Sequence, residues 1–391
     1  MNSEDRFKLI TRNLEEVLTE DELKALISSG KPLKHYIGFE VSGKLHIGQG
    51  LFTMLKIKDL QEVGVEITIL IADWHTWLNK KLDGKLETAT RLGKEYLIEA
   101  FKAGALCVGA DPEKINFVLG SDFYSKAGLD YWGTVIKIAK ATTLARMMRS
   151  TTIMGRKEGD ISDSAMLIYP AMQSADIFTL GINLTHSGTD QRNVHIVARD
   201  SANGLGFTKP VALHHHLLQG LSKPVDEEFL IKWQQANENA TRKTGPGVGT
   251  IALAEEDKSV LIEAMKMSKS KPDSAVFITD SPEEIKRKLN NAFCPEGEVK
   301  FNPILDWVKF LIFYEPNSSL EIKRDEKFGG DITYSSYEEL EKDYTEKKLH
   351  PQDLKMAVAE WLIKKLEPAR KYFEEPKRKA ALEEVEKLTQ R

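Results

Sequence analysis

The sequence predicts an α/β fold, in which a Rossmann-like parallel sheet forms the N-terminal domain and a mostly helical domain follows. Strand-like and helix-like segments alternate in the N-terminal half, which is typical of parallel strands joined by right-handed crossovers. Continuous β-branched runs within this alternation are typical of strands that are buried on both faces. The length of 391 residues is also long for a single core, so we expect two domains.

The alternating elements can be followed in order. HYIGFEV (35–41) predicts a short strand, and GLFTMLKIKDLQEVG (50–64) has helical spacing before a glycine stop. EITILIADWHTWL (66–78) begins as a buried strand, and LETATRLGKEYLIEAFKAGA (86–105) is helical again. KINFVLGSD (114–122) predicts a strand and a turn. Ligands of such sheets bind at the carboxyl ends of the strands, at a switch point in the strand order.

The remaining segments differ from these in composition. The first 27 residues predict a charged helix, and residues 123–160 predict a basic helical stretch. Residues 223–264 are polar and rich in Lys and Glu, which predicts an inserted segment with little to bury. The part from about residue 281 alternates helix-like segments with the turn-rich KFGGDITYSS and closes on a charged helical tail.

The bulk composition excludes several classes of protein. Hydrophobic residues make up 41% and charged residues 29%, which is ordinary for a globular protein. There is no run of about 20 apolar residues, so we expect no membrane-spanning helix, and the start of the chain lacks the pattern of a signal peptide. Cys107 and Cys294 lie far apart, which excludes a disulfide framework and a Cys-rich zinc site and indicates a reducing cytoplasm. The net charge of -4 means that a nucleic-acid partner must be bound by local basic patches.

The stretch KLHIGQG (44–50) lies between a predicted strand and a predicted helix. Such a loop offers free backbone N–H groups and the positive end of a helix, which together bind phosphate. His46 adds a hydrogen-bond donor, and the glycines let a ligand approach the backbone. Taken alone, the stretch fits a helix start with a surface histidine equally well.

A second motif, MKMSKSKPD (265–273), places Lys266 and Lys269 in a short serine-rich segment that Lys-Pro ends. A solvated charge run is the usual explanation of such a pattern. Its occurrence after the sheet, in a chain that carries a His-x-Gly loop earlier, favours a mobile loop that brings cations to phosphates.

These motifs occur together with others of one family. The sequence resembles the class I aminoacyl-tRNA synthetases, and among them the archaeal and eukaryotic tyrosyl-tRNA synthetases, over nearly its whole length. The stretches that carry the resemblance are YIGFEVSGKLHIGQG, ILIADWHTWLN, IYPAMQSADI, GTDQRNVH, KMSKS, SPEEIKRKLNNAFCP, KFGGDITYSSYEELE and LHPQDLK. Two features depart from the family pattern: Gln49 replaces the second histidine, and residues 223–264 have little counterpart in shorter members.

The resemblance implies a two-step reaction. Tyrosine and ATP give tyrosyl-adenylate and pyrophosphate, and the tyrosyl group then passes to the 3′ end of tRNA(Tyr). Attack of a carboxylate on the α-phosphate needs positioning and positive charge more than acid–base help. The implied catalytic residues are His46 and Gln49 on one side of the phosphates, with Lys266 and Lys269 on the other. Mg²⁺ would enter with ATP, and no zinc is expected.

The resemblance also implies the residues that contact each substrate. The glutamine amide at position 49 still donates a hydrogen bond to phosphate but carries no charge, so we expect a working site. The residues expected to bind ATP are Gly38, Gly43, His46, Gly48, Gln49, Lys266, Met267, Ser268, Lys269 and Ser270.

Tyrosine selection is expected from a second set of residues. By resemblance, Tyr36 and Asp176 bond the tyrosine hydroxyl, while Tyr169, Gln173 and Gln191 hold its amino group. The spacing agrees, because Tyr169, Gln173 and Asp176 share one face if their segment is a helix. The alternative is a half-buried helix with ordinary polar residues.

The histidines outside these motifs are expected to be structural. His75 follows a buried strand and is expected to line the pocket wall without a catalytic role. Among the three consecutive histidines at 214–216, only His214 and His216 can converge in a strand, and no acidic or cysteine partner is visible nearby. We therefore expect no metal site.

The tRNA-binding residues are expected in two regions. Arg146, Arg149 and Arg192 are candidates for the acceptor end, since arginine suits phosphates and base edges. Phe328, His350 and Asp353 match, by resemblance, the positions that grip the first anticodon base; rings stack on an unstacked base, and a carboxylate accepts from guanine. A core aromatic beside a Gly-Gly turn is the alternative for Phe328.

The expected domains follow from these assignments. Residues 1–280 form a catalytic domain, with a connective helical insertion at 123–160, a polar insertion at 223–264 and the KMSKS loop at 265–273. Residues 281–391 form a C-terminal anticodon-binding domain. The resemblance further implies a homodimer in the cytoplasm. Two alternatives stay open: a tryptophanyl-tRNA synthetase, which shares fold and motifs, and a synthetase-like RNA-binding protein that does not aminoacylate.

Overall fold

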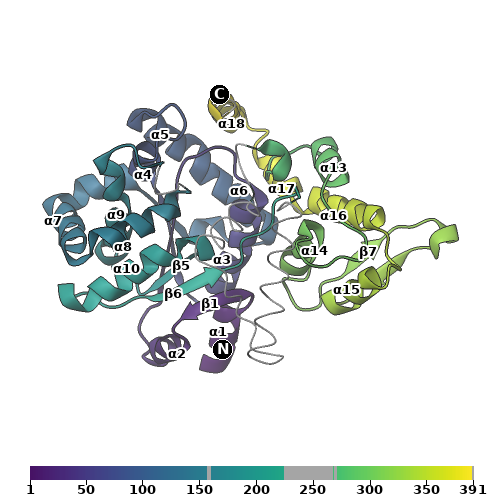
Figure 1. Ribbon diagram of the computed structural model, residues 1–391, viewed down its shortest axis with the longest axis horizontal. Helices are drawn as coiled ribbons and strands as arrows, with labels where there is room; N and C mark the ends of the chain where they lie inside the picture. The colour runs from purple at the N-terminus through teal and green to yellow at the C-terminus, as the bar shows by residue number, and fades with distance from the viewer. Residues whose placement is uncertain (156–159, 224–266, 268–270, 390–391) are drawn as a thin grey trace. The chain divides into compact units, whose positions relative to one another are not determined.

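The computed structural model describes residues 1–155, 160–223, 267 and 271–389. The chain divides into two compact units (Figure 1). The first contains Met1–Leu217, Phe277–Asp280 and Lys365–Arg391, and the second contains Leu218–Val276 and Ser281–Lys364. The end of the chain thus packs with the N-terminal unit. The functional division at residue 280 stays a prediction.

A six-stranded sheet lies at the centre of the first unit, counted over the described residues. Its strand order is β1-β6-β5-β2-β3-β4, and every neighbouring pair is parallel except β1 and β6. The predicted α/β fold with a mostly parallel sheet is confirmed. The strands are β1 (Leu14–Leu18), β2 (Lys34–Phe39), β3 (Glu66–Ile71), β4 (Ile115–Leu119), β5 (Leu184–Gly188) and β6 (Val211–His215).

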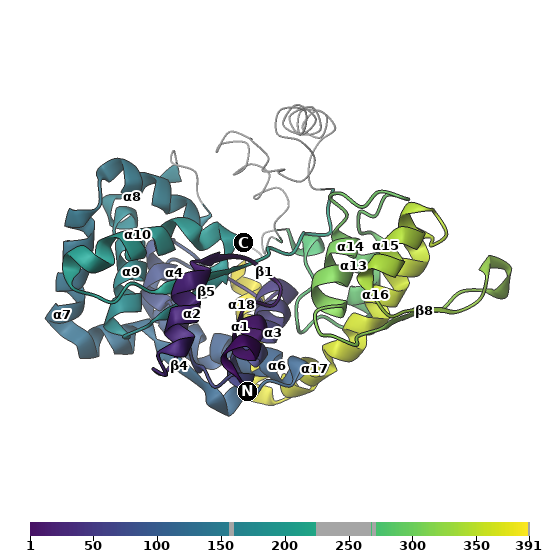
Figure 2. The ribbon, with the colours of Figure 1, turned by 90° about the horizontal axis from the view of Figure 1, so that it is seen from below.

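Helices cover the sheet and connect its strands. After β2, a π-helical turn η1 (Gly48–Phe52) continues into α3, as the spacing of residues 50–64 predicts. Helix α9 packs against both α7 and α10, and α17 packs against α6 (Figures 1 and 2). None of the described helices is long and apolar enough to cross a bilayer. Helices of the first unit are α1 (Ser3–Thr11), α2 (Glu20–Ser28), α3 (Thr53–Glu62), α4 (Asp73–Leu78), α5 (Leu86–Leu92), η2 (Gly93–Leu97), α6 (Ile98–Val108), α7 (Gly120–Ala141), α8 (Leu144–Ser150), α9 (Tyr169–Thr179), α10 (Arg192–Ala202), α17 (Glu367–Tyr372) and α18 (Pro376–Thr389).

The start of the chain is not one charged helix, and the prediction for the first 27 residues is wrong. Helices α1 and α2 flank the strand β1, whose residues pair antiparallel with β6. The sequence LEEVL has no strong β preference, so the pairing partner decides its conformation. A capping box between Thr19 and Glu22 then starts α2 directly after the strand.

The second unit is mostly helical, as expected for the C-terminal part. Its core includes the fully buried Trp307, whose indole N–H donates to the carbonyl of Gln219 at 2.8 Å. A two-stranded antiparallel ribbon projects from the helices. Elements of this unit are α13 (Pro282–Asn290), α14 (Pro303–Trp307), β7 (Leu320–Ile322), β8 (Ile332–Tyr334), α15 (Tyr337–Thr345) and α16 (Pro351–Lys365).

The strand order of the large sheet reverses between β2 and β5. The chain runs from β2 outward through β3 and β4, then returns to form β5 and β6 on the other side of β2. Ligands of open α/β sheets bind beyond the carboxyl ends of the strands at such a reversal. The fold therefore directs attention to the residues that follow Phe39 and Gly188.

Candidate active site

The loop of residues 43–50 leaves the carboxyl end of β2 at this switch point. The backbone N–H of Leu45 donates to the Tyr96 hydroxyl at 2.9 Å, and the Leu45 carbonyl accepts from the N–H of Ile278 at 3.0 Å. His46 forms an isolated antiparallel bridge with Phe277. The loop, which we call the nucleotide loop, is therefore held from two sides by segments distant in sequence.

The nucleotide loop turns directly into a helix. The N–H groups of Gln49 and Gly50 donate to the His46 carbonyl at 3.0 and 2.8 Å. Helix α6 approaches this turn closely, because a Cβ at Gly104 would lie only 2.1 Å from the carbonyl oxygen of Gly50. Gln49 Oε1 is buried and has no hydrogen-bond partner within the described residues. His46 and Gln49 are thus both placed at the positive end of a helix, where anions bind.

A buried carboxylate, Asp176 of α9, is the centre of a second cluster. The Tyr131 hydroxyl donates to Asp176 Oδ1 at 2.9 Å, and the Tyr36 hydroxyl donates to Oδ2 at 3.4 Å. Both phenols are buried, Tyr36 on β2 and Tyr131 on α7. The structure therefore brings Tyr36 and Asp176 together, and their contact with a substrate hydroxyl stays a prediction. Gly38 leaves room for the Tyr36 hydroxyl, which a Cβ at position 38 would approach to 2.8 Å.

Burial governs the protonation of this cluster. Desolvation raises the pKa of Asp176 to about 7, while the hydroxyls of Tyr131, Tyr124 and Tyr36 hold it lower than burial alone would. Desolvation also lowers the pKa of His75 to about 3, so this imidazole is neutral. His75 Nε2 lies 3.9 Å from Asp176 Oδ2 and has no hydrogen-bond partner among the residues that the structure describes. His75 lines the cluster, as expected. Its Nδ1 is 3.4 Å from the Tyr124 hydroxyl, whereas its Nε2 has no hydrogen bond to any described residue.

Two further polar chains join α9 to the neighbouring elements. The Tyr169 hydroxyl donates to Glu40 Oε1 at 2.9 Å, and Glu40 also accepts from the Asn79 amide at 2.8 Å. Gln173 Nε2 donates to Gln191 Oε1 at 3.4 Å. Tyr169, Gln173 and Asp176 lie on the predicted helix, and Pro170 occupies its first turn.

Sequence reasoning missed two groups at this site. Tyr131 lies in a long helix that carries several aromatic residues, and no spacing rule connects it with Asp176. Glu40 directly follows β2, at the carboxyl end of the strand where ligands bind, and this position could have indicated that it belongs to the site. Its carboxylate adds negative charge near the expected amino-group contacts of Tyr169.

Comparison with known proteins identifies the family. The family model of tRNA synthetases class I (W and Y) matches residues 28–224 and 260–367. The tyrosine–tRNA ligase of Thermococcus sibiricus is 49% identical over 384 residues, which are 96% of each chain. The chain belongs to the archaeal-type tyrosyl-tRNA synthetases.

Solved structures of this family have the same fold. The crystal structure of tyrosyl-tRNA synthetase complexed with L-tyrosine from Pyrococcus horikoshii has a TM-score of 0.88 and 45% identity, covering 99% of this chain and 100% of that chain. The structure of tyrosyl-tRNA synthetase from Aeropyrum pernix has a TM-score of 0.79 and 37% identity, with the same coverage. The resemblance read from the motifs is confirmed over the whole chain.

The lysine loop of this family lies largely outside the described residues. Lys266, Ser268, Lys269 and Ser270 are not described, and the prediction for them stays untested. Met267 is described and buried. Of the predicted glycines, Gly43 has a positive φ of 130° and Gly48 begins the turn η1.

The predicted acceptor-end arginines of this tyrosyl-tRNA synthetase lie on two helices. Arg146 forms an ion pair with Asp200 at 2.6 Å, and Arg192 forms one with Glu16 at 2.9 Å. Arg149 is exposed in the last turn of α8. To bind phosphate, Arg146 and Arg192 would have to leave these carboxylates or use N–H groups that the ion pairs do not occupy.

The predicted anticodon residues all belong to the second unit. Phe328 has 65% of its surface exposed, so the alternative of a core aromatic is wrong. His350 Nδ1 accepts from the N–H of Gln352 at 3.1 Å, and Asp353 lies in the first turn of α16. Arg324 donates to the carbonyls of Gly330 and Lys348, which connects the turn after Phe328 with the segment before His350.

The consecutive histidines do have acidic neighbours, contrary to the expectation. Strand β1 brings Glu16 to His214 at 2.8 Å and Glu15 to His216. His215 points to the opposite face and contacts His186 at 2.7 Å. Within the described ranges, no group of three or more His, Cys, Asp or Glu is arranged to hold a metal ion.

Proposed function

We propose that this chain activates L-tyrosine with ATP and transfers the tyrosyl group to the 3′ end of tRNA(Tyr), as a tyrosine–tRNA ligase. One observation carries the proposal: a single strand, β2, contributes Tyr36 to a buried phenol-and-carboxylate cluster and leads directly into the nucleotide loop. The full-length likeness to tyrosine–tRNA ligases supports the same reaction.

The proposed chemistry of activation is positioning. The tyrosine carboxylate attacks the α-phosphate of ATP, forms the mixed anhydride and releases pyrophosphate. His46, Gln49 and the helix start donate hydrogen bonds to phosphate oxygens, where negative charge is located. Lys266 and Lys269 complete this set from the other side. ATP enters as its Mg²⁺ complex, because Mg²⁺ is generally held by substrate phosphates.

Selection of tyrosine is assigned to the Asp176 cluster. A buried carboxylate accepts a hydrogen bond from the substrate hydroxyl, and Tyr36 adds a second polar contact. A site built for a hydroxyl leaves its own polar groups unpaired when the substrate lacks one, which disfavours phenylalanine. Tyr169, Gln173 and Gln191 are proposed to hold the amino group, with Glu40 supplying negative charge beside them. An indole has no hydroxyl for Asp176, so tryptophan is disfavoured too.

The transfer step can be tested directly. Purified protein should charge tRNA(Tyr) with labelled tyrosine in the presence of ATP and Mg²⁺, and Asp176→Ala should lose this activity while keeping its circular dichroism spectrum. A wild-type protein that charges no tRNA with tyrosine would refute the proposal. We also propose a cytoplasmic location, which the free thiols of Cys107 and Cys294 support because they suit a reducing compartment.

We also propose that the protein works as a homodimer. The resemblance implies one, and helix α7 carries a stripe that suits it. Leu129 and Ile136 are 89% and 62% exposed, lie seven residues apart on one helix, and have Gly133 between them. Leu144 at the start of α8 is 69% exposed. Large apolar side chains this exposed suit a surface that a second copy of the chain covers.

Sedimentation velocity tests the dimer. Ile136→Asp should shift the wild-type dimer to a monomer, because a charge on the stripe would be buried without a partner. Leu106→Asp, on the exposed side of α6, is the matched control and should leave the dimer intact. A wild-type protein that sediments as a monomer at micromolar concentration would overturn the proposal.

A further inference from the structure

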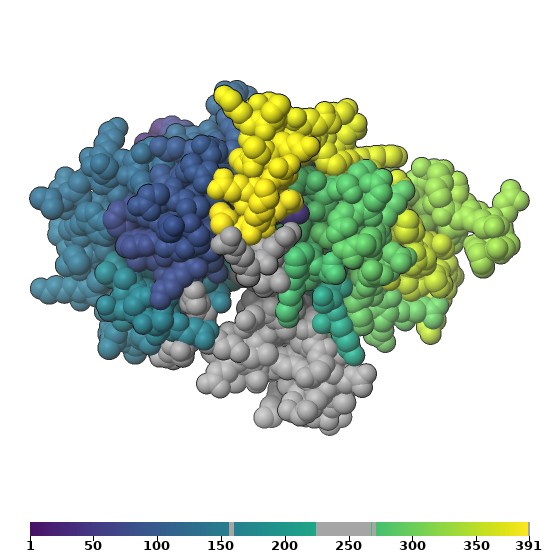
Figure 3. All heavy atoms as spheres, turned by 90° about the horizontal axis from the view of Figure 1, so that it is seen from above, coloured from purple at the N-terminus to yellow at the C-terminus, as the bar shows by residue number. Residues whose placement is uncertain are grey.

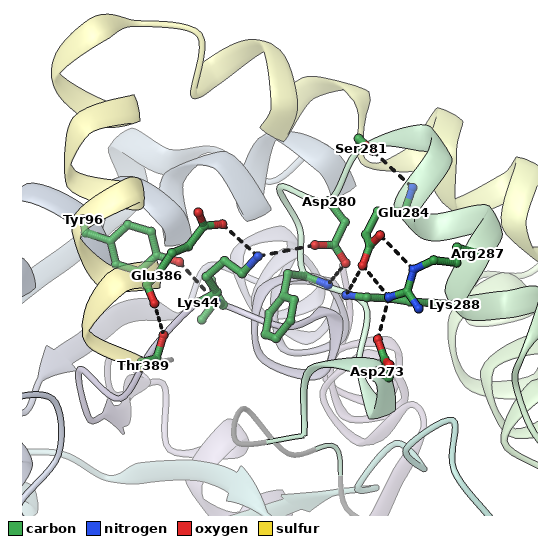
Figure 4. Close-up of polar contacts among 12 residues, drawn as sticks. Lys44, Tyr96, Asp273, Asp280, Ser281, Glu284, Arg287, Lys288, Glu386 and Thr389 are labelled. Atoms are coloured by element: carbon green, nitrogen blue, oxygen red, sulfur yellow. Dashed lines mark hydrogen bonds and ion pairs between the residues drawn. The ribbon is translucent and has the colours of Figure 1, made fainter. Parts of the chain in front are cut away.

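The side chain of Lys44, two residues before His46, lies between two carboxylates (Figure 4). Its Nζ is 2.9 Å from Glu386 Oε1 and 3.7 Å from Asp280 Oδ1, and it also lies over the ring of Phe277 at 4.6 Å. The side chain of Lys44 is 22% exposed and that of Asp280 is 3% exposed. The side chain of Glu386 is 35% exposed, so the pair of Lys44 with Glu386 is partly shielded from solvent. A partly shielded ion pair is stronger than a fully exposed one.

Glu386 belongs to α18, close to the end of the chain, and α18 is fastened to the first unit. Arg91 donates to both carboxylate oxygens of Glu384, at 2.9 and 2.5 Å. Glu99 accepts from the Tyr372 hydroxyl at 2.7 Å and from Arg378 Nε at 2.9 Å. Figure 3 shows these C-terminal atoms, in yellow, lying against the blue atoms of the N-terminal unit.

A second route joins the same segment to the nucleotide loop. The ring of Phe373 packs against the ring of Tyr96, with centroids 6.0 Å apart. Tyr96 is fully buried, and its hydroxyl accepts the backbone N–H of Leu45 at 2.9 Å. Leu45 is thus fixed through its backbone, and Lys44 is fixed through its side chain.

We propose that the C-terminal segment, residues 365–389, is a positioning element for the nucleotide loop. Lys44 and Glu386 are positioning residues in the activation of tyrosine. The two ion pairs of Lys44, with Glu386 and with Asp280, fix the start of the loop against Phe277–Asp280, the segment that pairs with His46. The inference rests on the proposed function and assigns the chain end to the first reaction step, although most of the C-terminal part is expected to read tRNA.

The physical consequence concerns ATP more than tyrosine. The carboxylate of Glu386 keeps Lys44 in one orientation, and so keeps the loop and the His46 imidazole that follow it in the position proposed for contact with phosphate. If the loop is not held in place beforehand, part of the binding free energy is used to order it, and the affinity for ATP falls. The tyrosine cluster is built on β2, α7 and α9 and does not include the loop, so its affinity should not change.

Pyrophosphate exchange with three single variants and one double variant tests this. Glu386→Gln should raise the KM for ATP by about twofold to fivefold, the upper part of the range expected for one partly exposed ion pair, while the KM for tyrosine stays constant. Glu383→Gln is the matched control, because it removes the same charge from an exposed position on the same helix. In a Lys44→Gln background, Glu386→Gln should have no further effect, because both act through one contact.

The outcomes separate the two proposals. If wild type shows no tyrosine-dependent exchange, the proposed function fails. If wild type is active but Glu386→Gln and Glu383→Gln have the same KM for ATP, the positioning role fails. It also fails if Glu386→Gln raises both KM values together with a lowered Tm, which a merely structural contact would do.

Discussion

Asp176, a carboxylate without solvent contact, is the residue to which we assign the selection of tyrosine. Two tyrosine hydroxyls stabilise its charge, yet burial still raises its pKa to about 7. The ionised form accepts hydrogen bonds at every lone pair, whereas the protonated form must donate at one oxygen. An incoming substrate hydroxyl therefore meets its best partner when Asp176 is ionised.

This leads to a pH dependence of tyrosine binding. As the pH rises through about 7, Asp176 loses its proton and accepts more strongly, so the KM for tyrosine in the exchange reaction should fall. Below the pKa, the change can reach about tenfold for each pH unit. Asp176→Asn should have a high and pH-independent KM, whereas Asp130→Asn, exposed on α7, should keep the wild-type profile. A wild-type KM that does not vary between about pH 6 and pH 8 contradicts this role.

The glutamine at position 49 provides a second prediction. Gln49→Ala should slow adenylate formation with little effect on the KM for tyrosine, because the variant loses one preorganised donor to phosphate. Losing such a donor costs about 2.7–4 kcal/mol in the barrier. Gln49→His should stay active. Single-turnover formation of adenylate measures this, and an unchanged rate in Gln49→Ala would make the position structural.

At the scale of single residues, the sequence predicted which residues belong to the site better than it predicted which residues contact one another. Tyr36 and Asp176 could be paired from the resemblance to the family, and helical spacing could place Asp176 on one face with Tyr169 and Gln173. Tyr131 could not, because the contact depends on how α7 packs against α9, which no local pattern encodes. The carboxylates beside Arg146, Arg192 and the histidines were missed for the same reason.

The turn from the nucleotide loop into α3 depends on close packing against α6. Gly104 permits this, since any side chain there would meet the carbonyl oxygen of Gly50. Gly104→Ala should therefore displace the turn, lower the free energy of unfolding by about 1–3 kcal/mol and raise the KM for ATP. Thermal denaturation and exchange kinetics measure the two effects. Gly204→Ala, where no atom lies within 4 Å of an added Cβ, is the control. Equal behaviour of the two variants would show that the close approach has no consequence.

Among the elements, strands β2, β3 and β4 and the helices between them were predictable, because short apolar runs alternate there with helical spacing. Strands β5 (LTHSG) and β6 (VALHH) were not predicted, because their polar residues and histidines hide the apolar pattern. Strand β1 was not, because it is an edge strand whose Glu15 and Glu16 suit a helix equally well. Only its pairing with β6 distinguishes the two conformations. The interruption of the expected helix at 50–64 by a π-helical turn was equally invisible in the spacing.

The two compact units suggest how the molecule divides its work. Tyr36, His46, Gln49 and Asp176 belong to the first unit, together with the end of the chain. Met267 of the predicted lysine loop belongs to the second unit, as do Phe328, His350 and Asp353. The composition of the sequence suggested a division of the chain at a single point. Such a division could not show that residues after 364 pack with the first unit. That return depends on contacts such as Arg91 with Glu384, which join residues nearly three hundred positions apart.

The second unit can be tested without disturbing the first. Asp353→Ala should weaken charging of tRNA but leave pyrophosphate exchange unchanged, because a carboxylate that faces guanine selects a base and takes no part in activation. Charging of tRNAs that differ only at the first anticodon base measures the preference. Glu338→Ala, exposed in the same unit, should behave as wild type. Equal base preference in wild type and Asp353→Ala would remove Asp353 from the recognition site.

The central claim is that a tyrosine-selective pocket and a nucleotide site meet on one strand. Tyrosine-dependent exchange of pyrophosphate into ATP, compared with tryptophan and phenylalanine under the same conditions, tests it most directly. The structure predicts rapid exchange with tyrosine and negligible exchange with the other two, because only tyrosine brings a hydroxyl to Asp176. Exchange that is equal for tyrosine and phenylalanine, or that is supported by tryptophan instead, would contradict the account.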